Sequence, residues 1–179
     1  TIQLYKQEHQ GKEPSNNPQD AEWVRWRANK ITDFLTQVFR AVEAKKEKVM
    51  ISLSPNPQQF SYNSYLADWA SWERLGLVEE LVVQIYRDDL KSFIDQLSQP
   101  ALQVARRQIP VGVGILTGTW RRPVNIAQIR QAVRAVRAHG CEGGSVYYWE
   151  RVWGRRASGS PRLRWTAVHQ LRSEPRDPN

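Results

Sequence analysis

The stretch Val49–Arg87, VMISLSPNPQQFSYNSYLADWASWERLGLVEELVVQIYR, decides how this chain folds. It holds two short apolar runs, VMISLS at 49–54 and LVVQIY at 81–86, with a Trp-rich segment between them. Apolar runs of this length that are bounded by turn residues are typical of strands buried on both faces. In parallel-sheet enzymes the functional residues lie at the carboxyl ends of the strands. The polar and aromatic residues that end each run therefore predict a ligand site as well as a sheet.

Helical patterns alternate with strand patterns along the rest of the chain. A long helix is predicted to begin with Asn17 as its N-cap and Pro18 in its first turn, and to pack one apolar face. Residues 55–67 are expected to form a loop. Strands alternating with helices indicate parallel βαβ units, so the fold class is α/β: half of an eight-stranded barrel, or a small open sheet. The other predicted elements are strands at 110–116 and 145–149 and helices at 68–75, 88–97, 101–107 and 125–138.

The composition is that of a folded domain with a basic second half. The 179 residues are enough for one core, and we expect a domain at 1–155 followed by a basic tail at 156–179. The formal net charge is +8, and residues 101–179 hold 14 arginines against four acidic residues. Solvated helix faces account for this charge as well as an anionic partner does, so we expect no nucleic-acid partner. A basic module that binds nucleic acid is the alternative interpretation of the same charge.

Several classes of site are disfavoured by what the sequence lacks. No apolar run approaches the ~20 residues of a membrane-spanning helix, and residues 1–10 do not read as a signal peptide. Cys141 is the one cysteine, which excludes an internal disulfide, and we interpret it as a small residue before a strand. The three histidines, at 9, 139 and 169, lack metal-ligand spacing. We expect no metal and no cofactor.

Polar residues at two predicted strand ends are candidates for binding a ligand. Gln84 and Tyr86 share one face of their strand, and Ser54 and Asn56 end the previous one. Such residues could form the hydrogen-bonding wall of a pocket at the carboxyl ends of the strands. For Gln84 the alternative is that its amide satisfies buried backbone groups.

Tryptophans lie on or next to the same strand-end segments. Trp69, Trp120 and Trp149 could stack on sugar rings, whereas Trp72 is predicted to lie in the core. The alternative for any of them is plain burial, because tryptophan removes a large apolar surface from water.

Two carboxylates are placed where glycoside hydrolysis would need them. That reaction uses a carboxylic acid and a carboxylate on either side of the scissile bond. Glu150 follows the last predicted strand, and Asp68 follows the predicted loop at 55–67, which comes after the first predicted strand. Glu150 could instead pair with an arginine, and Asp68 could instead be the N-cap of its short helix.

The chain resembles the glycosyl hydrolase-like family 10, a bacterial group of TIM-barrel proteins, over roughly residues 1–155. The order and spacing of several pieces carry this resemblance, including Asp68–Trp69, Trp72 and Gly76. The others are WRAN at Trp26–Asn29, SLSPNP at Ser52–Pro57, QIYR at Gln84–Arg87, GVGILTG at Gly112–Gly118 and YYWE at Tyr147–Glu150.

The resemblance implies that the chain corresponds to strands five to eight of a TIM barrel. The family's Asp-Asp-aromatic motif at the end of strand four is not in this sequence, and the Arg-rich tail after Trp153 departs from the family pattern. The implied substrate is a cell-envelope polysaccharide such as peptidoglycan glycan strands, and the implied location of the parent protein is extracytoplasmic.

We therefore expect a fragment of a glycoside-hydrolase-like barrel whose parent hydrolyses a polysaccharide and which is inactive alone. A half barrel expressed alone exposes its lumen layers and two sheet edges, so it is expected either to be unstable alone or to form a homodimer that re-forms a barrel. The alternative is a non-catalytic carbohydrate-binding or envelope-scaffold protein.

Overall fold

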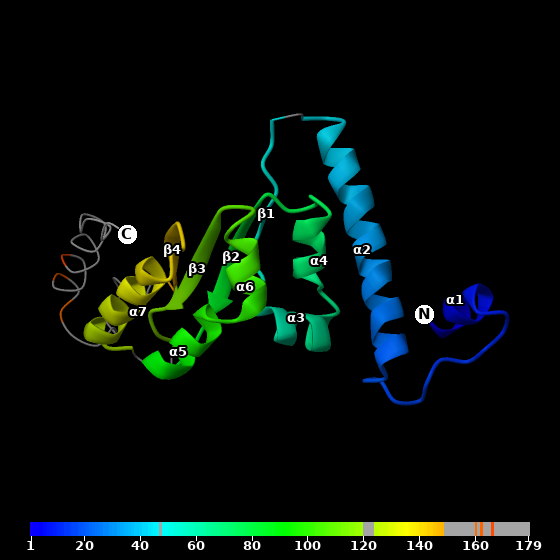
Figure 1. The fold of residues 1–179 in the computed structure, drawn as a ribbon, viewed down its shortest axis with the longest axis horizontal. Helices are drawn as coiled ribbons and strands as arrows, with labels where there is room; N and C mark the ends of the chain where they lie inside the picture. Colours follow the sequence, from blue (N-terminus) through cyan, green and yellow to red (C-terminus); the bar gives the residue numbers. More distant parts are fainter. Residues whose placement is uncertain (47, 120–123, 149–159, 161, 163–165, 167–179) are drawn as a thin grey trace.

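A four-stranded parallel sheet lies at the centre of the computed structural model, which describes residues 1–46, 48–119 and 124–148 and positions 160, 162 and 166 (Figure 1). Its strands follow one another in chain order, β1-β2-β3-β4, and all three pairings are parallel. This arrangement confirms the predicted α/β class. The strands are β1 (Ser52–Leu53), β2 (Glu80–Ile85), β3 (Val111–Leu116) and β4 (Gly143–Tyr147), and the helices that connect β2 to β4 are α5 (Leu90–Leu97), α6 (Pro100–Ala105) and α7 (Ile126–Ala138).

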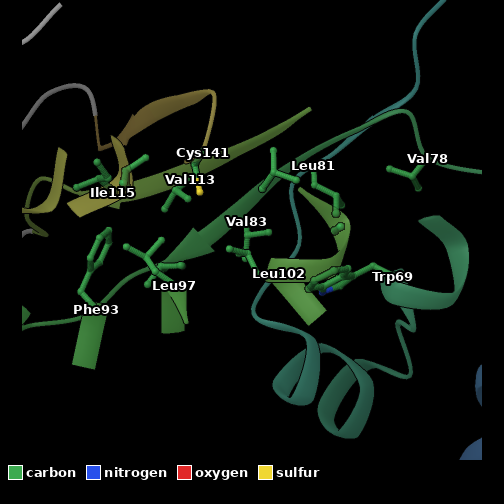
Figure 2. Close-up of a cluster of buried hydrophobic side chains, with 14 of the residues drawn as sticks. Trp69, Val78, Leu81, Val83, Phe93, Leu97, Leu102, Val113, Ile115 and Cys141 are labelled. Carbon is green, nitrogen blue, oxygen red and sulfur yellow. The ribbon is translucent and has the colours of Figure 1, made fainter. Parts of the chain in front are cut away.

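One face of the sheet is packed under helices. Figure 1 shows α5, α6 and α7 on the same side of the sheet, and their apolar side chains meet those of β2 and β3. Figure 2 shows Phe93, Leu97 and Leu102 pointing towards the strands. We call this side the covered face; its strand residues, all buried, are Leu81, Val83, Ile85, Val111, Val113 and Ile115.

The other side of the sheet, the open face, carries a different kind of residue. Between the buried residues of β2, Val82 and Gln84 are half-buried, and Ser145 and Tyr147 of β4 are exposed. The prediction that the strands are buried on both faces is therefore wrong for β2, where burial alternates residue by residue. The members of the open face are Val82, Gln84, Gly112, Gly114, Leu116, Gly143, Ser145 and Tyr147, together with Tyr86 just after β2.

The helix α2 (Ala21–Glu43) packs on two sides rather than the predicted one. On one side Leu35 and Phe39 pack against the core under the sheet. On the other, Trp23 and Trp26 stack on each other and meet the ring edge of Tyr5 in α1 (Ile2–Glu8). Figure 1 shows α1 on the side of α2 that faces away from the sheet.

The beginning of α2 differs from the prediction. Asp20, not Asn17, is its N-cap, because the Asp20 side chain accepts a 3.0 Å hydrogen bond from the backbone N–H of Trp23. The Asn17 side chain instead accepts from the N–H of Gln19, and the Asn17 carbonyl from the N–H of Asp20. Asn17 therefore closes a turn before the helix.

The first predicted strand is much shorter than its apolar run. Only Ser52–Leu53 pair with β2. Val49 and Met50 are exposed, and Pro55 cannot donate a ladder hydrogen bond, although its carbonyl still accepts from the N–H of Gln84. β1 is thus a two-residue strand at the edge of the sheet, whereas the sequence predicted a strand over residues 49–54.

A helix replaces most of the predicted loop at 55–67. The helix α3 (Gln58–Tyr65) begins after Pro57, and the hydroxyl of buried Ser61 donates to the Asn56 carbonyl. It is followed by α4 (Trp69–Arg74), which ends before Gly76 much as predicted.

Candidate functional site

The candidate site lies on the open face, at the carboxyl ends of the parallel strands. Here the Gln84 side-chain amide donates to the Ser54 carbonyl at 2.8 Å and to the Ser54 hydroxyl at 3.3 Å. The Ser54 hydroxyl in turn donates to the Val82 carbonyl at 3.0 Å. The structure therefore brings Ser54 and Gln84 together, and the Gln84 amide satisfies backbone, which was the alternative weighed from the sequence.

Asn56 anchors the two helices that follow β1. Its backbone carbonyl accepts from the Ser61 hydroxyl at 2.8 Å and from the Trp69 indole N–H at 2.9 Å. Trp69 is only 1% exposed, so its ring packs in the core and offers no face to a sugar. This corrects its prediction as a stacking platform, because the indole N–H finds its partner inside the protein. Trp72 is buried as predicted.

Asp68 lies in the predicted place but is occupied as a helix cap. One carboxylate oxygen accepts from the Gln58 amide at 2.7 Å and from the Ser71 N–H at 3.3 Å, and the other accepts from the Ser71 hydroxyl at 2.6 Å. Gln58 also accepts from the N–H of Ala70. This network gives Asp68 the N-cap role that was the alternative to catalysis.

Three tyrosines near the carboxyl ends of β2 and β4, Tyr86, Tyr147 and Tyr148, lie next to one another, and we call them the tyrosine row. The rings of Tyr86 and Tyr147 are stacked, with centroids 5.1 Å apart and planes 17° apart, and Tyr148 lies 5.6 Å from Tyr147. A β-carbon placed on Gly114 would lie 3.4 Å from Cε1 and 3.5 Å from Oη of Tyr86, so the phenol rests on the glycine backbone. Burial, and secondarily Tyr147, raises the pKa of the Tyr86 phenol above its ordinary value.

Thr117, just after β3, holds the backbone of this row. Its buried hydroxyl accepts from the Tyr148 N–H at 2.9 Å and donates to the Tyr148 carbonyl at 3.2 Å. The Thr117 N–H donates to the Tyr147 carbonyl. The sequence prediction missed Tyr147 and Thr117 as site residues. The YYW pattern in a strand was visible, but only the sheet register places Tyr147 beside Tyr86.

Three predicted site residues, Trp120, Trp149 and Glu150, lie outside the described residues. Their roles stay predictions. Of the predicted set, the structure thus joins Ser54 and Gln84 by hydrogen bonds and places the Tyr86 ring against Tyr147, on the side of β2 away from Ser54. It assigns Asp68, Trp69 and the backbone carbonyl of Asn56 to the packing and capping of α3 and α4.

Residues 1–135 match the family model described as glycosyl hydrolase-like 10. The chain belongs to this family. The glycosyl hydrolase-like 10 match includes the described site residues from Ser54 to Tyr86, and it ends within α7, before β4 begins. Tyr147 and Tyr148 therefore lie beyond the matched residues. No curated protein matches the chain.

Membership of the glycosyl hydrolase-like 10 family confirms the resemblance drawn from the sequence and gives this chain a glycosidase-like fold. The numbering of its strands as five to eight of a barrel remains a prediction. Within the described part of the chain, no helix is long and apolar enough to span a membrane.

A small cavity lies under the helices of this glycosyl hydrolase-like 10 domain, within the described part of the chain. It has a volume of about 10 Å³ and lies between α5, α7 and the ends of β2 and β3, lined by residues such as Ile85, Phe93 and Ile129. This volume is about that of one water position. This cavity is therefore too small for a sugar ring.

Proposed function

We propose that this chain is part of a glycosidase-like domain that acts on a cell-envelope polysaccharide such as the glycan strands of peptidoglycan. The observation that supports it best is the group of polar and aromatic side chains at adjacent strand ends of the open face, in a chain of a glycosyl hydrolase-like family. In parallel α/β enzymes this end of the sheet carries the ligand. Such a substrate implies that the native protein works outside the cytoplasm.

In this proposal the strand-end residues divide into three roles. Gln84 and Ser54, already bonded to each other, accept hydrogen bonds from sugar hydroxyls through the Gln84 amide oxygen and the Ser54 hydroxyl oxygen. Asn56 contributes its side-chain amide beside them. Tyr86 adds an aromatic contact, and Trp120 and Trp149 provide rings for stacking. Glu150 is the proposed acid or base, with its main carboxylate partner in the parent protein.

Hydrolysis is tested on the native protein, after its amino terminus has been determined in the source cell. Purified peptide-free glycan strands are incubated with it and the release of reducing ends is measured. Glu150→Gln is expected to lower the rate by about 10²–10⁴, the usual contribution of a general acid or base. An unchanged rate in this variant contradicts the catalytic role of Glu150.

The matched control is Asp68→Asn. Because Asp68 caps α4 and holds Gln58 and Ser71, its replacement is expected to cost about 1 kcal/mol of stability and to leave the hydrolysis rate within a factor of a few at low temperature. A collapse of the rate with an unchanged melting temperature would show that Asp68 is catalytic after all.

A second candidate function is carbohydrate binding without catalysis. It is favoured by the commitment of Asp68 to helix capping, because both of its carboxylate oxygens are bonded within the protein. Saturable glycan binding by the native protein with no release of reducing ends would select this candidate over the hydrolase.

We also propose that the chain by itself associates with a second copy. In the described sheet, β1 and β4 each pair along one side only, and Val82, Gln84 and Ser145 of the open face are half-buried or exposed. Unpaired strand edges are templates for pairing with another chain. Sedimentation velocity over a range of concentrations should show a dimer; a monomer throughout contradicts this proposal.

A further inference from the structure

The tyrosine row has a geometry that the hydrogen-bonding part of the site does not explain. Tyr86 follows β2 and Tyr147 ends β4, and β3 lies between these two strands. Neighbouring strands are about 4.8 Å apart, so the two tyrosine backbones are separated by roughly twice that distance. Their rings nevertheless stack at 5.1 Å above β3. They can meet there because β3 presents Gly114, which has no side chain, beneath the Tyr86 ring.

The row stays largely in contact with solvent. Tyr147, the last residue of β4, is 50% exposed, and Tyr148 is 40% exposed. On the same face of β4, Ser145, two residues before Tyr147, is also exposed. A tyrosine row next to this small exposed residue leaves room for a flat ligand ring to approach the sheet.

The row is also held in place before any ligand arrives. The buried Thr117 hydroxyl makes two hydrogen bonds to the Tyr148 backbone, and the Thr117 N–H donates to the Tyr147 carbonyl. An aromatic side chain with two torsion angles that is already fixed by stacking loses little entropy on binding. Rigid, half-exposed aromatic rings are typical of ligand anchors rather than of simple packing.

We propose that Tyr147, stacked on Tyr86 and held through its backbone by Thr117, forms a subsite that receives the apolar face of a pyranose ring of a glycan. This inference rests on the proposed function and adds to it a binding residue beyond the family-matched part of the chain. Tyr147 is the contact residue, and Thr117 and Gly114 are positioning residues. The ring supplies apolar surface, and the phenol hydroxyl supplies a donor and an acceptor to the sugar hydroxyls.

The contact is tested by isothermal titration of the native protein with the N-acetylglucosamine tetramer and with peptide-free peptidoglycan glycan strands. Tyr147→Leu is expected to weaken binding about tenfold, since it removes the aromatic surface. Tyr147→Phe keeps the ring and should stay within about threefold of the wild type. The control is Phe34→Leu on α2, where the ring is 65% exposed and far along the chain from the row; its affinity should be unchanged.

The positioning role of Thr117 is tested by a second pair of variants. Thr117→Val keeps the shape but removes both hydrogen bonds to Tyr148, so affinity should fall several-fold. Thr117→Ser keeps the hydroxyl and should restore binding to near the wild-type value. Rescue by serine separates positioning from a general loss of stability, which thermal melts of both variants measure in parallel.

The outcomes separate this inference from the proposed function. If the wild type binds either glycan and Tyr147→Leu binds equally well, the subsite is wrong and the function stands. If Phe34→Leu loses affinity as much as Tyr147→Leu, the subsite is also wrong. If the wild type binds neither glycan, the proposed function fails and the subsite fails with it.

Discussion

The two faces of the same sheet are built from different residues for different tasks. On the covered face, Leu81, Val83 and Ile85 of β2 are each at most 1% exposed and pack under α5 and α6. On the open face, the alternating residues Val82 and Gln84 are half-buried, and Tyr147 is half exposed. Successive side chains of one strand thus serve the core and the candidate site in turn.

The difference separates stability from ligand binding within a single strand. Removing side chains from the covered face leaves a cavity in a close-packed interior. Removing them from the open face mainly changes what a ligand can contact. Variants at neighbouring positions should therefore differ in kind, and this expectation can be tested from the largest effect to the smallest.

The largest effect is expected when two adjacent residues of β2 are replaced by alanine in separate variants and their stabilities are compared. Leu81→Ala deletes a fully buried side chain and is expected to lower the free energy of unfolding by about 2–5 kcal/mol. Val82→Ala on the open face should cost less than about 1 kcal/mol, because its side chain is only half-buried. Urea denaturation followed by far-UV circular dichroism measures both. Equal losses would show that the open face is packed as tightly as the covered one.

A second test concerns Gly114, the residue against which the Tyr86 ring packs. Gly114→Val places branched carbons where the Tyr86 ring already lies 3.4 Å from the position of a β-carbon, so the ring must shift and its stack on Tyr147 is disturbed. We expect glycan affinity to fall several-fold, roughly 1 kcal/mol. The matched control is Gly143→Val on the same face, where a β-carbon meets nothing. Similar affinities for the two variants would mean that the stack does not contribute to binding.

A third test measures how α2 is attached beside the covered face. The Trp72 indole N–H donates to the Thr32 hydroxyl at 2.8 Å, which joins α4 to α2. Trp72→Phe, Thr32→Val and the double variant form a cycle, and we expect a coupling of about 1 kcal/mol in the free energy of unfolding. A coupling near zero would show that apolar packing by Leu35 and Phe39 alone holds α2 in place.

The smallest effect is expected where neither face of the sheet is involved. Glu8 of α1 accepts from Lys30 at 2.7 Å and from the Trp26 indole at 2.8 Å, and these bonds lower the pKa of its carboxyl. Because the pKa is lower in the folded chain, the stabilisation is present above the unfolded pKa, about 4.3, and disappears as pH falls through the folded pKa.

Thermal melts of wild type and Glu8→Gln across pH 3–7 measure this effect. The wild type should melt slightly higher at pH 6–7, and the difference should close as the pH falls below about 4. Glu43→Gln, at the exposed end of α2, is the control and should show no such convergence. A difference between wild type and Glu8→Gln that does not shrink at all as the pH falls towards 3 would contradict the ion-pair contribution.

Local signals predicted most of the fold. Asp68, Asp89 and Asn125 each cap a helix whose start could be read from a capping residue before an apolar pattern. Both strongly apolar strands, β2 and β3, formed where the runs LVVQIY and VGVGIL predicted them. The same reasoning missed α3, because QQFSYNSY lacks helical apolar spacing and its start depends on Pro57 and on the contact of Ser61 with Asn56.

The candidate site was predictable as a location but not as a set of contacts. The alternation of strands and helices implied that Ser54 and Gln84 lie at the carboxyl ends of parallel strands, and the structure brings them into hydrogen-bonding distance. The sequence also places Trp69 near the end of β1, but its ring lies in the core because of the way α4 packs. Exposure of a large aromatic residue is decided by neighbours that are distant in sequence.

The sequence by itself determined the alternation of strands and helices, the caps of α4, α5 and α7, and the family, since these depend on composition and spacing over a few tens of residues. Tertiary structure alone decided which faces those elements present. The parallel register sets Gln84, Gly114 and Ser145 side by side, and with them it brings Tyr86 to Tyr147 across a glycine. Residues 61 positions apart meet because strand pairing and a missing β-carbon allow it, and no local pattern encodes that contact.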